Sequence, residues 1–214
     1  MTRALFIIDP QNCFMDFEGG DMPLPVPGAL ADMKRLATYI RNDPHRFDAI
    51  YVTLDTHPVD HISHANRWVD GDGNNPDPFT LITHGEYKRK IWRATKPTDQ
   101  VLQDFYLRRL EEEGRIHTIW PIHGQKGEFE YEVEAELSDA LDRWSELTGN
   151  QVVYVEKGMH RDTEQFGIFA ATVPVPGAPE TYLNRKLVDE VNQFDEVEFA
   201  GEAESHCAKD SIDQ

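Results

Sequence analysis

Two short apolar runs, each ending in an aspartate, limit the possible folds of this chain more than any other feature. They are Ala4–Asp9 ("ALFIID") and Ala49–Asp55 ("AIYVTLD"). Their β-forming residues show no polar alternation, which is typical of strands buried on both faces. Between them, apolar residues recur at helical spacing: Leu30, Met33, Leu36, Ala37 and Ile40. A strand, a helix and a strand at this spacing predict a βαβ unit with a parallel strand pair.

The same alternation returns towards the C-terminus. A second set of apolar residues predicts an amphipathic helix that Gly149 ends: Val133, Leu137, Ala140, Leu141, Trp144 and Leu147. The run "QVVYVEKG" from Gln151 predicts a strand, and Glu196–Ala200 predicts another, followed by a turn and a helix that opens near Cys207. We therefore expect an α/β fold with a mostly parallel sheet flanked by helices, and 214 residues suit one domain, 1–214.

The pattern breaks down between Asn66 and Ile116. This stretch holds the polar, turn-forming "VDGDGNNPDPF" and a helical pattern with Val101, Leu102, Phe105, Tyr106 and Leu110. We interpret 66–116 as an insertion after the second strand, at the edge of the sheet or over its mouth. An open α/β sheet usually continues beyond a helix such as the one near Cys207, so we expect a C-terminal strand and helix to be absent from this sequence.

Charge and cysteine usage narrow the class of protein. The formal net charge is −18 and the sequence pI is about 4.8, so nucleic acid and anionic membranes would be repelled. There is no N-terminal apolar segment of the signal type and no apolar run long enough to cross a bilayer. Cys13 and Cys207 lie far apart, and we expect a cytoplasmic protein with free thiols.

Four reactive side chains stand at or just after predicted strand ends: Asp9, Asp55, Lys157 and Cys207. The carboxyl ends of parallel strands open onto one crevice, so these residues can meet. A cysteine at a turn that leads into a helix has its thiolate favoured by the helix dipole, and neighbouring N–H groups can hold an oxyanion. Cys207 is therefore our candidate nucleophile, although a buried cysteine or a strand-end aspartate is often structural. We interpret Cys13 as a packing residue.

The stretch "VTLDTHPVDHISHANRW" favours a metal site at the end of the second strand. Asp55 and His57 are two residues apart, so on an extended backbone both side chains point the same way. Carboxylate and neutral imidazole together suit Zn, Fe or Mn with water in the open positions.

Five segments together resemble the isochorismatase-like cysteine hydrolase family, and the nicotinamidases (pyrazinamidases) most closely within it: "IIDPQNCF", "DTHPVDH", "WPIHG", "VEKG" and "GEAESHC". The resemblance covers almost the whole chain outside 66–116. It implies a Rossmann-type three-layer fold, a catalytic triad of Asp9, Lys157 and Cys207, and hydrolysis of nicotinamide to nicotinate and ammonia through a cysteine thioester. It also implies a role in NAD salvage and a homo-oligomer.

The resemblance assigns further site residues. Asp55, His57 and His123 would bind one divalent ion, and His61 falls where some nicotinamidases supply another histidine, at a shorter spacing from His57 here. His64 is a weaker candidate. The other histidines are interpreted as structural or surface residues: His45, His84, His117, His160 and His206.

The resemblance also predicts the substrate pocket. Phe14 and Trp120 would form its aromatic walls, and Ala203 would follow a cis peptide bond from Glu202. The N–H groups of Ala203 and Cys207 would then form an oxyanion hole. Gly124 departs from the family pattern, since nicotinamidases commonly carry a cysteine there, and the insertion 66–116 leaves the size of the substrate open.

Three functions fit these observations. The first is a metal-containing cysteine amidohydrolase, a nicotinamidase above all. The second is another cysteine hydrolase of the family that acts on a carbamoyl or ureido amide, generally without metal. The third is a catalytically silent binding protein that keeps the fold, with a structural metal closed by protein ligands.

Overall fold

The computed structural model describes the backbone of residues 1–214 and every side chain except those of Glu204 and Ser205, and within it a four-stranded parallel sheet has the order β7-β2-β1-β8. The strands are β1 (Arg3–Ile8), β2 (Ala49–Asp55), β7 (Val153–Lys157) and β8 (Glu196–Gly201). Strands β1 and β2 occupy the middle of the sheet, and their apolar runs are buried as the sequence predicts. Because all four strands are parallel, their carboxyl ends lie at the same edge.

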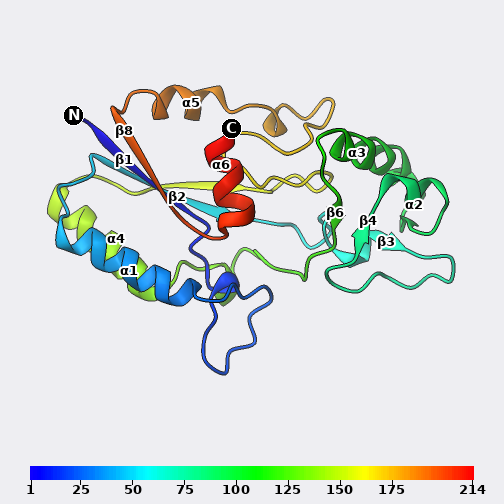
Figure 1. The fold of residues 1–214 in the computed structure, drawn as a ribbon, viewed down its shortest axis with the longest axis horizontal. Coiled ribbons are helices and arrows are strands. Elements are labelled where there is room, and N and C mark those ends of the chain that lie inside the picture. Colours follow the sequence, from blue (N-terminus) through cyan, green and yellow to red (C-terminus); the bar gives the residue numbers. More distant parts are fainter.

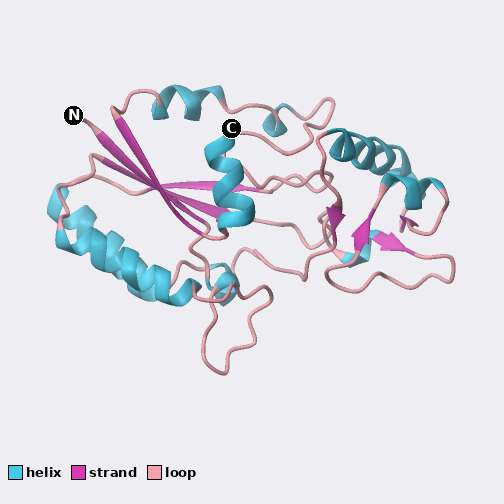
Figure 2. Ribbon diagram, viewed as in Figure 1, coloured by secondary structure: helices cyan, strands magenta, loops and turns pink.

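Helices cover the sheet on both faces, so the α/β fold predicted from the sequence is confirmed (Figures 1 and 2). Helices α1 (Ala29–Asn42) and α4 (Ala135–Thr148) pack on one face, where their apolar stripes meet Leu5, Ile50 and Val52 of the sheet. Helix α5 (Arg185–Val191) packs on the other face, in a cluster with Phe6 and Cys207. The short α6 (Lys209–Asp213) follows a π-helical turn, Glu204–Ala208, that contains Cys207.

Residues 62–119 form a lobe around a separate hydrophobic cluster, which also includes Val173. Its elements are β3 (Trp68–Val69), β4 (Leu81–Ile82), α2 (His84–Lys88), β5 (Arg93–Ala94), α3 (Gln100–Glu112) and β6 (His117–Thr118). Trp68 and Tyr106 are the largest side chains buried in the cluster. The lobe contains the whole of the segment 66–116 and lies beyond the carboxyl ends of the strands (Figure 1, green and cyan). The helix predicted around Val101–Leu110 is α3.

Among the described residues, every helix is too short or too polar to span a membrane.

Candidate functional site

The four strand-end residues predicted from the sequence meet at the carboxyl edge of the sheet. Lys157, the last residue of β7, lies opposite Asp55 of β2 in the strand register. Its Nζ is 2.9 Å from Asp9 Oδ2, 2.9 Å from Asp55 Oδ1 and 3.5 Å from Cys207 Sγ. Each of the four residues is at most 9% exposed. A cation, two carboxylates and a thiol therefore share one buried cluster.

Charge balance inside the cluster determines where its protons reside. Burial lowers the pKa of Lys157, but Asp55 and Asp9 outweigh this and hold it well above its usual value, so the amine is charged. Burial raises the pKa of the Cys207 thiol, and Lys157 offsets only part of that rise. Burial also raises the pKa of Asp9 against the opposing effect of Lys157. Asp9 and Asp55 raise the pKa of the thiol further, so its proton stays on sulfur until a base removes it.

Two residues that the sequence did not single out hold these carboxylates in place. Thr53 Oγ1 donates to Asp9 Oδ1 at 2.6 Å and accepts from the Asp9 N–H at 2.9 Å. The amide side chain of Gln11 brackets the backbone of Asp55, accepting from its N–H at 2.6 Å and donating to its carbonyl at 3.0 Å. Thr53 and Gln11 are buried polar residues near the strand-end aspartates. Their spacing in the sequence does not predict that Thr53 bonds to Asp9 and Gln11 to Asp55.

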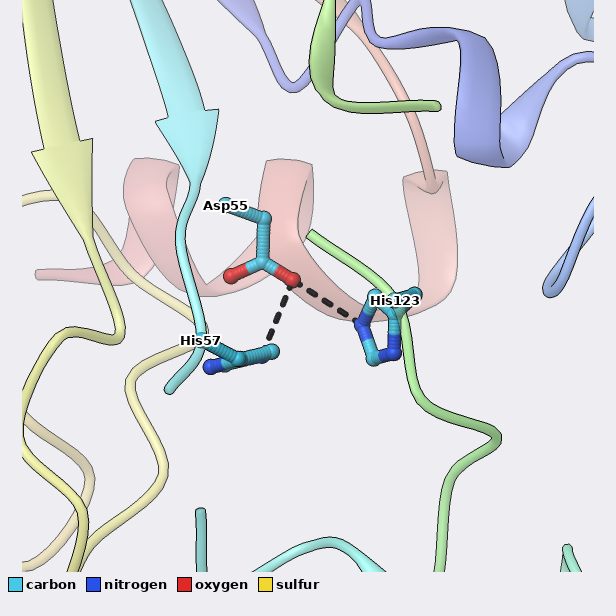
Figure 3. A group of neighbouring side chains, drawn as sticks. All are labelled: Asp55, His57 and His123. Carbon is cyan, nitrogen blue, oxygen red and sulfur yellow. Dashed lines mark hydrogen bonds and ion pairs between the residues drawn. The ribbon is translucent and has the colours of Figure 1, made fainter. Parts of the chain in front are cut away.

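Asp55, His57 and His123 form the first group that can hold a metal ion (Figure 3). Asp55 Oδ2 lies 3.1 Å from Nε2 of His57 and 3.1 Å from Nε2 of His123. The Nδ1 atoms contact backbone carbonyls, of Gly158 at 3.0 Å and of Pro121 at 2.8 Å. A carbonyl only accepts hydrogen bonds, so each Nδ1 carries a proton. Burial lowers the pKa of His57, but Asp55 outweighs this and raises it to about 9, so without an ion Nε2 of His57 is protonated as well. A metal ion would take the place of the proton on Nε2.

His61 and His64 differ in the state of their ring nitrogens. His61 stacks on His57 at 4.1 Å, and its Nδ1 and Nε2 contact Ser63 Oγ at 2.7 Å and the Thr163 carbonyl at 2.9 Å. His64 contacts the Val59 carbonyl through Nδ1 at 3.0 Å, while its buried Nε2 has no hydrogen-bond partner among the described side chains and backbone. Burial lowers the pKa of His64 to about 4, so the ring is neutral. The ring nitrogen without a partner therefore belongs to His64, which the sequence analysis ranks below His61 as a metal ligand.

Glu164 is a functional candidate that the sequence analysis missed. Its carboxylate is buried, and Oε1 lies 3.7 Å from His57 Nε2. His57, His61 and Glu164 form a second group whose possible ligand atoms lie within 4.8 Å of one another. Burial raises the pKa of Glu164, with His57 opposing. The residue follows β7 in an irregular loop, where no periodicity or strand end points to it.

A cavity of about 260 Å³ is lined by Cys207 and by the group Asp55, His57 and His123. Phe14, Trp120, Ala203 and Cys207 line it together with Asp55, His57 and His123 and with the following residues: Leu24, Pro25, Val26, Pro27, Glu164, Phe166 and His206. The volume is below the roughly 300 Å³ from which pockets for drug-sized ligands begin, so the cavity suits a small ring. The peptide bond between Glu202 and Ala203 is cis, as the resemblance predicts.

Cys13 differs from Cys207. Both are free and buried, but Cys13 packs in the hydrophobic cluster under α1 and α4, in agreement with its interpretation as a packing residue.

The fold matches those of solved amidases. The yeast nicotinamidase Pnc1p, bound to the inhibitor nicotinaldehyde, superposes with a TM-score of 0.67 at 20% identity over 98% of this chain and 79% of that chain. The pyrazinamidase of Pyrococcus horikoshii in complex with zinc gives 0.55 at 20% identity over 100% and 78%. An isochorismatase-like hydrolase from Alkaliphilus metalliredigens gives 0.50 at 14% identity over 100% and 74%.

Sequence comparison adds nothing to this result, since no family model and no curated protein sequence matches the chain. Because the identities are low, the likeness is one of fold. The chain has the isochorismatase-like fold, in the form found in solved nicotinamidases and pyrazinamidases.

Proposed function

We propose that this protein is a metal-containing cysteine amidohydrolase of the isochorismatase-like family, and a nicotinamidase in particular. One observation carries the proposal: the thiol of Cys207 lies in contact with Lys157 at the wall of a small, mostly apolar cavity that the group Asp55, His57 and His123 also faces. A nucleophile, a proton acceptor and metal-binding side chains thus converge where a small aromatic amide would fit.

The residues present suit a divalent ion. One carboxylate oxygen and two imidazole nitrogens converge, both imidazoles have their tautomer set by a backbone carbonyl, and the buried Nε2 of His64 has no partner among the described residues. Asp55, His57 and His123 would hold the ion, and Glu164 stands beside His57 to supply a further oxygen. When bound, the ion would act as a Lewis acid that orients the substrate's ring nitrogen.

The first half of the reaction is carried by the chain's own side chains. Asp9 takes the thiol proton of Cys207, and Lys157 stabilises the resulting thiolate. The thiolate sulfur forms a bond to the amide carbon, and the carbonyl electron pair moves onto oxygen. Asp9 then returns the proton to the amide nitrogen, the carbon–nitrogen bond breaks, and ammonia leaves a thioester on Cys207.

The second half uses the same groups in reverse order. Asp9 accepts a proton from a water molecule, whose oxygen attacks the thioester carbon. The carbonyl re-forms as the carbon–sulfur bond breaks, Asp9 passes its proton to the leaving sulfur, and the products are the carboxylic acid and the Cys207 thiol. In both halves the tetrahedral oxyanion would rest on the N–H groups of Ala203 and Cys207, each donor contributing about 3 kcal/mol in comparable sites. The acid formed from nicotinamide is nicotinate, which would serve NAD salvage.

The two alternatives predict different sites. A carbamoyl or ureido hydrolase without metal has no use for the convergent carboxylate and imidazoles. A silent binding protein would have its cysteine buried from solvent; Cys207 is only 9% exposed, but the surface that it keeps lines the cavity. Both observations support the metal-containing amidohydrolase.

The test is ammonia release from nicotinamide by the purified chain, beside Cys207→Ala and a chelator-stripped sample. We expect release by the metal-loaded protein and its loss in both controls. Folded, metal-loaded protein that releases no ammonia from nicotinamide would exclude the nicotinamidase assignment, and carbamoyl and ureido compounds would then be assayed.

A further inference from the structure

Arg67 is a buried cation of the lobe that the proposed chemistry does not use. It is 3% exposed, and its Nη2 pairs with Asp162 Oδ1 at 2.6 Å and with Asp99 Oδ2 at 3.2 Å. Arg161 adds a second cation, pairing with Asp99 at 3.2 Å and with Asp60 at 2.9 Å. The side chains of Arg67, Asp99 and Asp162 are at most 12% exposed, whereas those of Arg161 and Asp60 are 35% and 46% exposed, so the cluster reaches from the interior to the surface.

The guanidinium of Arg67 joins two loops that carry site residues. Its Nη1 donates to the Asp60 carbonyl at 2.8 Å and to the Arg161 carbonyl at 3.1 Å. Asp60 lies in the loop after β2, three residues beyond His57, and Arg161 lies in the loop after β7, four residues beyond Lys157. Arg67 Nη1 is therefore hydrogen-bonded to the backbone of two loops. One is the loop after β2, which carries His57, and the other is the loop after β7, which leads to Glu164.

Other residues of the lobe fix the backbone of Arg67 by hydrogen bonds. The Arg67 carbonyl accepts from the Thr95 N–H at 3.0 Å and from Gln103 Nε2 at 3.2 Å, and Asp99 precedes helix α3. Arg67 and Asp99 both belong to the segment 66–116, so the lobe is bonded to the site loops through this cluster.

We infer that Arg67 is a positioning residue, which fixes the loop after β2 against the loop after β7 and thereby sets the spacing of the metal-binding side chains. The inference rests on the proposed function. Arginine suits the task because its planar fork donates in two directions at once, while lysine offers the same charge as a point. Replacing Arg67 by lysine keeps a cation in the cluster, but its single nitrogen cannot bond both carbonyls and pair with both aspartates at once, as Nη1 and Nη2 of the arginine do.

The experiment compares Arg67→Lys with the wild-type chain loaded with Co²⁺, whose visible absorption reports the number and geometry of its ligands. We expect Arg67→Lys to change the Co²⁺ spectrum, to raise the metal dissociation constant about 10-fold or more, and to lower kcat at saturating metal. The variant Arg67→Met with Asp99→Asn and Asp162→Asn removes the buried charges together, and the same changes are expected there. Arg108→Met, an exposed site on α3 paired with Glu112, is the matched control.

The outcomes separate this inference from the proposed function. Arg67 variants that lower Tm yet leave the Co²⁺ spectrum and the metal dissociation constant within about twofold of wild type would show a merely structural role. A wild-type chain that binds Co²⁺ but hydrolyses no amide overturns the proposed function alone, since the spectrum still decides on Arg67. A wild-type chain without a Co²⁺ spectrum overturns both.

Discussion

Lys157 Nζ lies 3.5 Å from Cys207 Sγ, although the two residues are separated by 50 positions, Lys157 at the end of the edge strand β7 and Cys207 in the turn after the opposite edge strand β8. The same amine is 2.9 Å from a carboxylate oxygen of Asp9 and 2.9 Å from one of Asp55. One cation thus compensates two buried anions and faces the thiol that would become a third.

Replacing Lys157 by methionine should affect stability and activity together. Asp9 and Asp55 would be left buried without their cation, which costs about 3–5 kcal/mol in comparable sites, and loss of thiolate stabilisation should lower amide hydrolysis at least about 100-fold. Urea unfolding and ammonia release measure the two effects. Lys126→Met removes an exposed amine paired with Glu156, and stability should change by less than about 0.5 kcal/mol. Wild-type turnover in Lys157→Met would contradict the assigned role.

Alanine substitutions at two glycines separate the effect of backbone strain from the effect of a steric contact with His57. Gly158 and Gly149 both have φ of +74°. A Cβ on Gly158 would lie 2.6 Å from His57 Cε1 and 2.8 Å from its Nδ1, whereas nothing lies within 4 Å of a Cβ on Gly149. Each alanine variant should lose about 1–2 kcal/mol of stability to the left-handed backbone. Only Gly158→Ala should also displace His57.

Metal affinity distinguishes the two glycine variants. In competition with a chromogenic chelator, Gly158→Ala should bind Zn²⁺ about 10–100-fold more weakly than wild type, as expected when a metal ligand loses its orientation. Gly149→Ala should bind as wild type does. Equal affinities in the two variants would mean that His57 is not a ligand or that its position tolerates the shift.

Thr53→Val should move the pH dependence of the reaction. The hydroxyl hydrogen bond lowers the pKa of Asp9 against the larger, opposite effect of burial, so its removal should raise that pKa further. The carboxylate must be ionised to accept the thiol proton, and the acid limb of kcat/KM should therefore shift to higher pH. A pH profile measures the shift, and Thr53→Ser, which keeps the hydroxyl, should retain the wild-type limb. An unchanged limb in Thr53→Val would exclude Asp9 as the group that titrates.

His117 should make the lobe sensitive to acid. Burial lowers the pKa of His117 to about 3 in the folded chain, against about 6.5 in an unfolded one. Between these pH values His117 is protonated in the unfolded chain but neutral in the folded one. The free energy of unfolding therefore has its full value above pH 6.5 and decreases as the pH falls towards 3. Between pH 7 and pH 5 this loss is about 2 kcal/mol.

A variant isolates the contribution of His117. Asparagine is neutral throughout this range, so the stability advantage of wild type over His117→Asn should shrink by about 2 kcal/mol from pH 7 to pH 5. Urea unfolding at the two pH values gives the difference. A constant difference would mean that His117 is protonated in the folded chain or stays neutral in the unfolded one.

The parallel sheet could be predicted because its signals are local. The run Ala49–Asp55 is β2 with the same bounds, and the apolar residues Leu30–Ile40 lie within α1. The parallel arrangement then brings Asp9, Asp55 and Lys157 to one edge, which follows from strand ends alone. For the same reason the approach of Cys207 to this edge could be expected.

The lobe and the finer parts of the site depend on contacts that no local pattern encodes. Strands β3 and β5 are two residues long and pair across more than twenty positions, so they leave no alternation to read. The resemblance favours His61 over His64, yet both ring nitrogens of His61 are engaged, Nε2 by the Thr163 carbonyl about a hundred residues away, whereas Nε2 of His64 has no partner among the described residues. Glu164 likewise becomes a site residue only through the path of the loop after β7.

The strand order also has a consequence for folding. β8 pairs with β1, so Arg3 is aligned with Glu196, and this is the pairing of greatest sequence separation in the sheet. Long-range pairings of this kind form late because the closing loop has the most conformational freedom to lose. A chain that has joined β1, β2 and β7 would already hold Asp9, Asp55 and Lys157 together, but it would have no nucleophile beside them. We expect this docking to come last in the sheet, and under the proposed function a chain that had not yet completed it would lack its nucleophile.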